Sequence, residues 1–276
     1  MNKPIRAHSD FILTLSSERF DALGRRIHAA LFLPAQLHLR PDAIAHNELH
    51  RPLRSRSRCR GGTAMHSVLD GVLAIHNAFR TDMAAIDTAA EAAARGAPGL
   101  DATVERFRFF NEILSYHAHG EEIAVFPMVE EVAPLVADTY AVDHQRLDVA
   151  FDRLSNAVSE HDALQTARAT AAFKFHLDTH LAKEDAQLFR IMRERISVPD
   201  QIKAVGTMSS TMPGSRVPEF TAWIYPLLGD DDRENFTRAL AMIMPWEAFA
   251  PGNPLIRDAA GDGFAELTRR MPELVG

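Results

Sequence analysis

Apolar side chains recur at the spacing of an α-helix immediately after Met65. They fall on every third or fourth position, which places them on one face of a helix with 3.6 residues per turn. The residues of this face are Val68, Val72, Ile75, Phe79, Met83 and Ile86. Glycine and proline interrupt the pattern at residues 96–99, so we expect the helix to end there.

Three further amphipathic segments follow, at residues 101–131, 137–159 and 162–196. We expect Pro127 to kink or end the first of them, because proline has no backbone N–H to donate. The apolar residues expected to face inward are Phe107, Phe110, Leu114, Phe126, Val142, Leu147, Phe151, Leu154, Leu164, Ala171, Phe175, Leu188, Phe189 and Met192. Four helices with short connections and no strand-like alternation predict an all-α fold, with an antiparallel up-down four-helix bundle at residues 65–197.

The two ends of the chain differ from the predicted bundle. Residues 198–276 are rich in proline and glycine and predict a helical C-terminal extension packed on the bundle. Its shorter helical stretches lie around residues 219–228, 233–244 and 263–271. Residues 1–64 carry 11 Lys and Arg against 5 Asp and Glu. They predict a basic N-terminal segment that is poorly ordered or, if translation starts at Met65, not native.

The net charge of −7 is unevenly distributed along the chain. Residues 65–276 carry 19 Lys and Arg against 32 Asp and Glu, so this part should repel nucleic acid and anionic membranes. No apolar run reaches the roughly 20 residues that a membrane-spanning helix needs. The single cysteine, Cys59, excludes an internal disulfide and favours a reducing compartment, which predicts a cytoplasmic location.

Histidine is frequent, with 13 residues against 3 tyrosines and 2 tryptophans. Each predicted bundle helix carries one histidine that can lie on its apolar side, and these are His76, His117, His144 and His180. Two helices repeat a longer pattern, with acidic residues at +4 and +5 from the histidine and phenylalanine at +9. The pattern reads His117, Glu121, Glu122, Phe126 in one helix and His180, Glu184, Asp185, Phe189 in the other. Positions i and i+4 share a helix face, so imidazole and carboxylate can converge.

The chemistry of these side chains favours a metal site. Carboxylates on an apolar helix face are costly unless they are paired or bound to a cation, and few lysines or arginines share this face. Two carboxylates can bridge two divalent cations while imidazoles bind each cation from outside. Nitrogen and oxygen donors without a thiolate suit iron or manganese better than a structural zinc.

The order of these residues resembles the hemerythrin-like (HHE cation-binding) family. The resemblance rests on His76, His117-x-x-x-Glu121, His144 and His180-x-x-x-Glu184-Asp185, and it covers about residues 66–196. It implies a four-helix bundle with a non-heme centre of two iron ions that meets dioxygen, peroxide or nitric oxide. The first two histidines would bind one iron, and the last two would bind the other.

The resemblance also implies bridging carboxylates between the two metals. Glu121 would be one bridge, and the other would be Glu184 or Asp185, since relatives of different function use the +4 or the +5 acid. We favour Glu184 because its position mirrors that of Glu121. Oxygen carriers of the family place a second histidine where this chain has Asp148, which is therefore a candidate ligand that weakens the oxygen-carrier interpretation.

Two functions follow as hypotheses. The first is a di-iron protein that binds or turns over a small oxidant, and the sequence leaves open whether it is an enzyme. The alternative is a module that senses iron or redox state and acts through residues 198–276 or an unidentified protein partner. Manganese is an alternative to iron in both cases.

Overall fold

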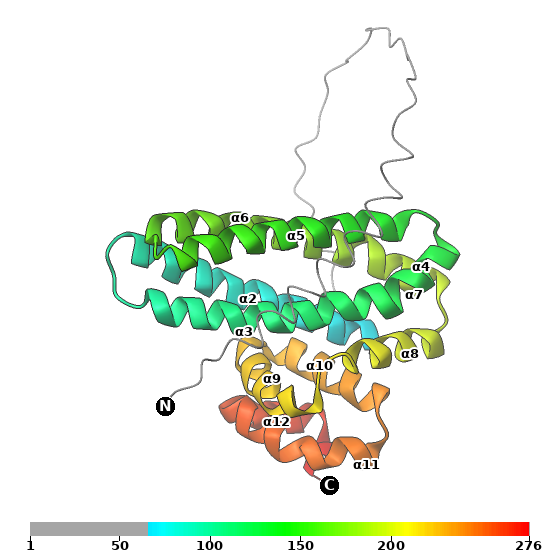
Figure 1. The fold of residues 1–276 in the computed structure, drawn as a ribbon. Helices are drawn as coiled ribbons and strands as arrows, with labels where there is room; N and C mark the ends of the chain where they lie inside the picture. The colour runs from blue at the N-terminus through cyan, green and yellow to red at the C-terminus, as the bar shows by residue number, and fades with distance from the viewer. Residues whose placement is uncertain (1–65, 276) are drawn as a thin grey trace, which may run out of the picture. The chain divides into compact units, whose positions relative to one another are not determined.

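The computed structural model describes residues 66–275, and its regular secondary structure is helical, with no strand among these residues (Figure 1). The predicted all-α class is therefore confirmed for this part of the chain. No helix within it is long and apolar enough to cross a membrane. The predictions made for residues 1–64 lie outside the described residues.

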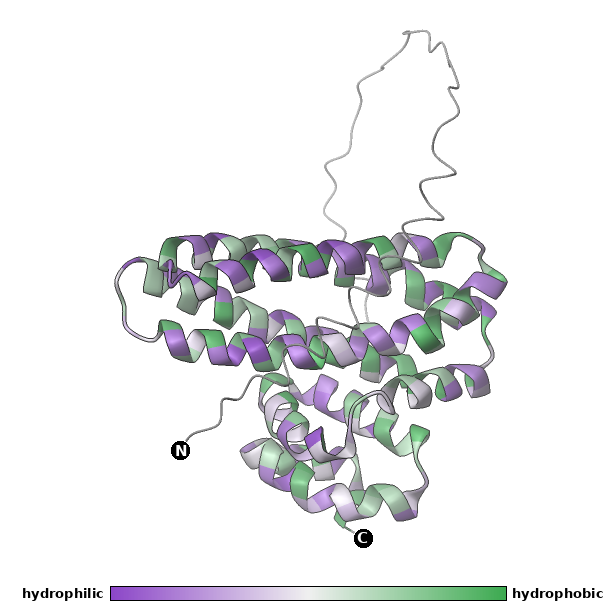
Figure 2. Cartoon of the chain, viewed as in Figure 1, coloured by the Kyte–Doolittle hydropathy of each residue, from purple (hydrophilic) through white to green (hydrophobic). Residues whose placement is uncertain are grey.

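Four long helices lie side by side (Figure 1). They are α2 (Val68–Ala94), α3 (Leu100–Gly120), α5 (Val136–Ser159) and α6 (Ala163–Lys183). Helix α2 contacts both α3 and α6, and α6 also contacts α5. Each of them carries both hydrophobic and hydrophilic residues (Figure 2).

Interactions and backbone angles of nearby residues determine where α2 begins and ends. Ser67 caps the helix, because its hydroxyl oxygen accepts from the Leu69 N–H, while Asp70 accepts from the Ser67 N–H at 2.9 Å. At the other end, Gly96 and Gly99 have φ values of 94° and 113°, which side chains with a Cβ rarely adopt. The predicted break at residues 96–99 is confirmed.

Two of the predicted helices contain a π-helical turn. The turns are η1 (Glu121–Val125), followed by α4 (Phe126–Val132), and η2 (Glu184–Leu188), followed by α7 (Phe189–Arg195). Pro127 lies in the first turn of α4, so the change of helix geometry falls where that proline predicts an interruption. The second turn has no proline. Both turns begin at the glutamate of the repeated motif, and π-turns of this kind are frequent at functional sites.

Several inward-facing predictions in α5 and α6 are wrong. Val142, Leu164 and Phe175 are 43%, 51% and 67% exposed, and Ala171 is also exposed, whereas Phe151 is half-buried. The inner face carries polar residues instead, including Asp143 and His144 in α5 and Thr166 and Thr170 in α6. The Thr170 hydroxyl donates to a backbone carbonyl one turn earlier, so this polar group is satisfied within the helix and can be buried. Leu147 and Leu154 of α5 are buried as predicted, so hydropathy alone selects the wrong face only in α6.

The C-terminal residues form further helices, of which α8, α11 and α12 are not among the predicted stretches. These helices are α8 (Val198–Ser209), α9 (Val217–Ile224), α10 (Asp230–Ile243), α11 (Trp246–Phe249), α12 (Asn253–Ala260) and α13 (Phe264–Arg270). Helix α10 packs along α2, and α8 packs against α3 and η1.

Two close contacts join these helices to the long ones. A Cβ on Gly120 would lie 2.5 Å from Cγ of Met208, so only glycine allows α3 and α8 to approach this closely. Buried Asp82 accepts hydrogen bonds from Trp223 Nε1 at 2.7 Å and from Arg106 Nε at 2.6 Å. The first contact lies directly beside Glu121, the first residue of η1.

Candidate metal centre

Six buried side chains from the repeated motifs and their partner helices converge inside the group of long helices. The histidines are His76 on α2, His117 on α3, His144 on α5 and His180 on α6, and the carboxylates are Glu121 and Glu184. All six are less than 9% exposed, and both glutamates are almost completely buried. The two glutamates are the first residues of η1 and η2, each one turn after a histidine of the set.

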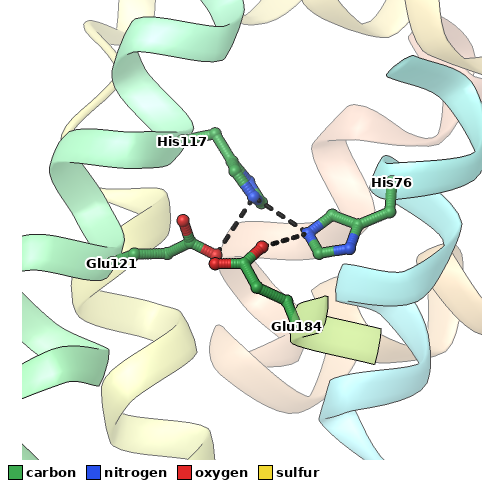
Figure 3. Close-up of side chains that lie close together, drawn as sticks. All are labelled: His76, His117, Glu121 and Glu184. Atoms are coloured by element: carbon green, nitrogen blue, oxygen red, sulfur yellow. Dashed lines mark hydrogen bonds and ion pairs between the residues drawn. The ribbon is translucent and has the colours of Figure 1, made fainter. Parts of the chain in front are cut away.

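These side chains form two groups that share both glutamates. The first group is His76, His117, Glu121 and Glu184, and the second is Glu121, His144, His180 and Glu184. Within each group, one potential ligand atom per residue lies within 4.8 Å of all the others. The side chains of the first group point toward one another (Figure 3).

Each glutamate directs one oxygen to each group. Oε1 of Glu121 lies 3.2 Å from Nε2 of His117, and Oε2 lies 3.5 Å from Nε2 of His144. Glu184 is arranged in the same way, with Oε2 3.7 Å from Nε2 of His76 and Oε1 3.4 Å from Nε2 of His180. This is the arrangement that two carboxylates need to bridge two cations.

The carboxylate oxygens of this cluster lack hydrogen bonds, whereas Nε2 of His76 lies 3.0 Å from Nε2 of His117. Both carboxylate oxygens of Glu121 and of Glu184, and Nε2 of His144, have no hydrogen-bond partner among the described residues. Unpaired carboxylate oxygens in a buried site cost several kcal/mol. Cations between the two glutamates would satisfy these atoms, so the donor set fits a pair of divalent metals.

The acidic residues at +5 do not belong to the two groups, and each contacts the Nδ1 atom of a histidine instead. Oδ1 of Asp185 lies 2.7 Å from Nδ1 of His76, and Oε1 of Glu122 lies 2.9 Å from Nδ1 of His144. In metal sites, such a carboxylate fixes the orientation of the imidazole and leaves its other nitrogen free for the cation. Arg80 donates to the second oxygen of Asp185 at 2.5 Å. Glu184 therefore belongs to both groups, whereas Asp185 belongs to neither and contacts Nδ1 of His76.

Asp148 does not join the cluster. It is exposed on α5 and belongs to neither group, one turn after His144. Sequence reasoning also missed that Asp143 lies behind His180, with Oδ2 4.0 Å from Nδ1, and that Lys183 pairs with this aspartate. The shared +5 offset of Glu122 and Asp185 was the one sequence signal that could have identified carboxylates in contact with the Nδ1 atoms of the histidines.

The pKa values within the cluster are strongly perturbed. Burial, followed by the nearby charge of Glu121, raises the pKa of Glu184 well above its usual value. Burial acts on Glu121 in the same direction, but His117 and His144 hold the pKa of Glu121 well below its usual value. The protein alone therefore does not stabilise negative charge on both carboxylates.

The histidine pKa values diverge in a similar way. Burial lowers the pKa of His180 to about 3 and also lowers that of His76. Burial opposes protonation of His144 as well, but the carboxylates of Glu121 and Glu122 raise its pKa to about 9. A cation at the second group would therefore have to displace a proton from His144.

No protein-family model and no solved structure matches this chain. Among curated proteins it is similar to the zinc finger protein BRUTUS of Arabidopsis thaliana, 28% identical over 149 residues, which cover 52% of this chain and 12% of that protein. It is also similar to two BRUTUS-like zinc finger proteins of the same plant. One is 22% identical over 184 residues (62% of this chain, 14% of that protein), and the other 23% identical over 156 residues (47% and 12%).

The matched part thus spans about an eighth of the length of these relatives. A zinc finger is held by at least two cysteines in its usual forms, and this chain has only Cys59. This chain therefore lacks the cysteines that a zinc finger needs.

Proposed function

We propose that this protein is a hemerythrin-like metalloprotein that binds two iron ions in an up-down bundle of α2, α3, α5 and α6. The observation that supports it most is the pair of buried glutamates, each with one oxygen toward a histidine of either group and neither oxygen hydrogen-bonded. In this proposal Glu121 and Glu184 bridge the metals. His76 and His117 bind one iron, and His144 and His180 bind the other.

The residues of the chain have separate tasks in such a centre. The six ligands give each metal two nitrogen and two oxygen donors, which suits iron and also permits manganese. Asp185 and Glu122 keep His76 and His144 in the orientation that presents Nε2 to the metal. Bound iron would supply a redox-active site for dioxygen, peroxide or nitric oxide.

A second candidate function is metal-dependent regulation, and one contact favours it. Glu121 follows Gly120, which packs against Met208 of α8. The position of this proposed metal ligand is therefore linked to the packing of α8 on the long helices. Loss of the metal would leave two buried carboxylates unpaired beside this contact. A sensor would report that change through residues 198–276 or through a partner protein.

The test is the metal content of protein purified from iron-supplemented cells. We expect about two irons per chain in the wild type, and loss of iron in His117→Ala and in His180→Ala. His119→Ala is the matched control, because His119 lies on the same helix as His117 but belongs to neither group. Iron that is absent from the wild type, or retained in both ligand variants, would contradict the proposal.

A further inference from the structure

A cavity of about 260 Å³ lies between the long helices and the C-terminal helices. Phe79 of α2 and Ile113 of α3 contribute to one wall. Phe220 of α9 and Leu240 of α10 contribute to the other. Val217 and Leu255, which line the cavity, are 39% and 40% exposed, so the cavity reaches the protein surface. A small molecule therefore has a route from solvent to the interior.

The hydroxyl groups that line this cavity already donate hydrogen bonds within the protein. The hydroxyls of Ser209, Thr211 and Thr221 donate to backbone carbonyls at 2.8–2.9 Å. The hydroxyl of Tyr116 donates to Glu112 at 3.2 Å. Among the described residues that line the cavity, none is Asp, Glu, Lys or Arg. A charged or strongly polar ligand would lose its hydration here without gaining partners.

The size of the cavity limits the ligand further. An apolar cavity of about 150 Å³ holds a benzene molecule, so a cavity of about 260 Å³ has room for a hydrocarbon of roughly ten carbon atoms. Three methionines, Met208, Met212 and Met244, line it. Their flexible thioethers can adapt to ligands of different shape.

One wall of the cavity is also part of the metal cluster. His117 lines the cavity, and its Nε2 lies 3.2 Å from Oε1 of Glu121. The ring of Phe79, 5.3 Å from that of His117, packs beside it. We propose that this cavity binds a small, uncharged lipophilic molecule of about ten carbon atoms and holds it against His117. Every contact that defines the cavity comes from the protein itself.

The first experiment is a calorimetric titration of the metal-free full chain with naphthalene. We expect saturable binding of one molecule per chain, and binding of 2-naphthoate at least about tenfold weaker because its carboxylate finds no partner. Leu240→Trp should weaken naphthalene binding at least about tenfold by filling the cavity. Met242→Trp is the matched control, since Met242 lies on the same helix, is also half-buried and does not line the cavity.

A second measurement locates the bound molecule without any substitution. In protein labelled with ¹³C at the methionine methyl groups, naphthalene should shift the signals of Met208, Met212 and Met244. Met83 and Met192 are buried but do not line the cavity, so their signals should not shift. The proposal is overturned by any of three results: no saturable binding, equal affinity for 2-naphthoate, or shifts confined to other methionines.

Discussion

Replacing Glu184 by glutamine should stabilise the metal-free protein and destabilise the metal-loaded one. Glu184 is fully buried, both of its carboxylate oxygens lack a hydrogen bond, and it lies against Glu121. The wild-type residue is therefore costly unless a cation pairs with it. Glutamine has almost the same shape but no charge, and its amide can donate a hydrogen bond to Glu121.

The size of the effect follows from the unpaired atoms. An unsatisfied buried polar group costs about 1–3 kcal/mol, and more when it is charged. We therefore expect metal-free Glu184→Gln to gain about 1–3 kcal/mol, at about 2–4 °C of melting temperature per kcal/mol for a domain of this size. With metal the order reverses, because a cation at 100 times its dissociation constant stabilises the wild type by about 2.7 kcal/mol.

The assay is thermal unfolding followed by circular dichroism, once with a chelator and once with excess ferrous iron under anaerobic conditions. Glu131→Gln is the control, because Glu131 is exposed and its substitution should change stability by less than about 0.5 kcal/mol in both states. If metal-free Glu184→Gln is no more stable than the wild type, the buried carboxylate does not lower the stability of the protein, and the reasoning is refuted.

Three further outcomes are expected. Asp185→Ala should weaken metal binding about 10–100-fold in a competition titration with a chelator, and unchanged affinity would remove its orienting role. Metal binding at pH 7 should release protons, because the pKa of His144 is raised to about 9; affinity should then fall as the pH falls, and heats that do not depend on the buffer would contradict this. Trp223→Phe should cost about 1–3 kcal/mol, because it removes a donor to buried Asp82. The exposed Trp246→Phe should cost less than about 0.5 kcal/mol in the same unfolding assay, and equal losses would exclude the hydrogen bond as the cause.

The positions of the long helices could be predicted from the sequence, because apolar spacing and the glycines at residues 96–99 determine them. The face of α6 could not, because the hydroxyl of buried Thr170 donates to the Thr166 carbonyl, which lets this polar residue lie inside, while Phe175 is left exposed. The π-turns at Glu121 and Glu184 also leave no trace in hydrophobic periodicity.

The candidate site could be predicted to the level of which side chains share a helix face. Four histidines and two glutamates that the sequence selected do lie together. The choice between Glu184 and Asp185 could not be made from the sequence, because adjacent residues differ by only about 100° around a helix. The structure distinguishes them, since Asp185 contacts Nδ1 of His76. Asp148 was selected by resemblance alone, and it lies outside both groups.

The cavity beside His117 could not be predicted at all from the sequence. Its lining comes from helices between residues 72 and 256, most of which are distant in the chain. Each contributes apolar residues that look like ordinary core positions in a linear sequence. Only the packing of α8–α12 on α2 and α3 encloses the space.

The central claim is that Glu121 and Glu184 bridge two metal ions. The most direct test is an anomalous difference map collected at the iron absorption edge from crystals of iron-loaded protein. We expect two peaks about 3.5–4 Å apart between the two glutamates, one beside His76 and His117 and the other beside His144 and His180. A single peak, or peaks away from these glutamates, would contradict the account.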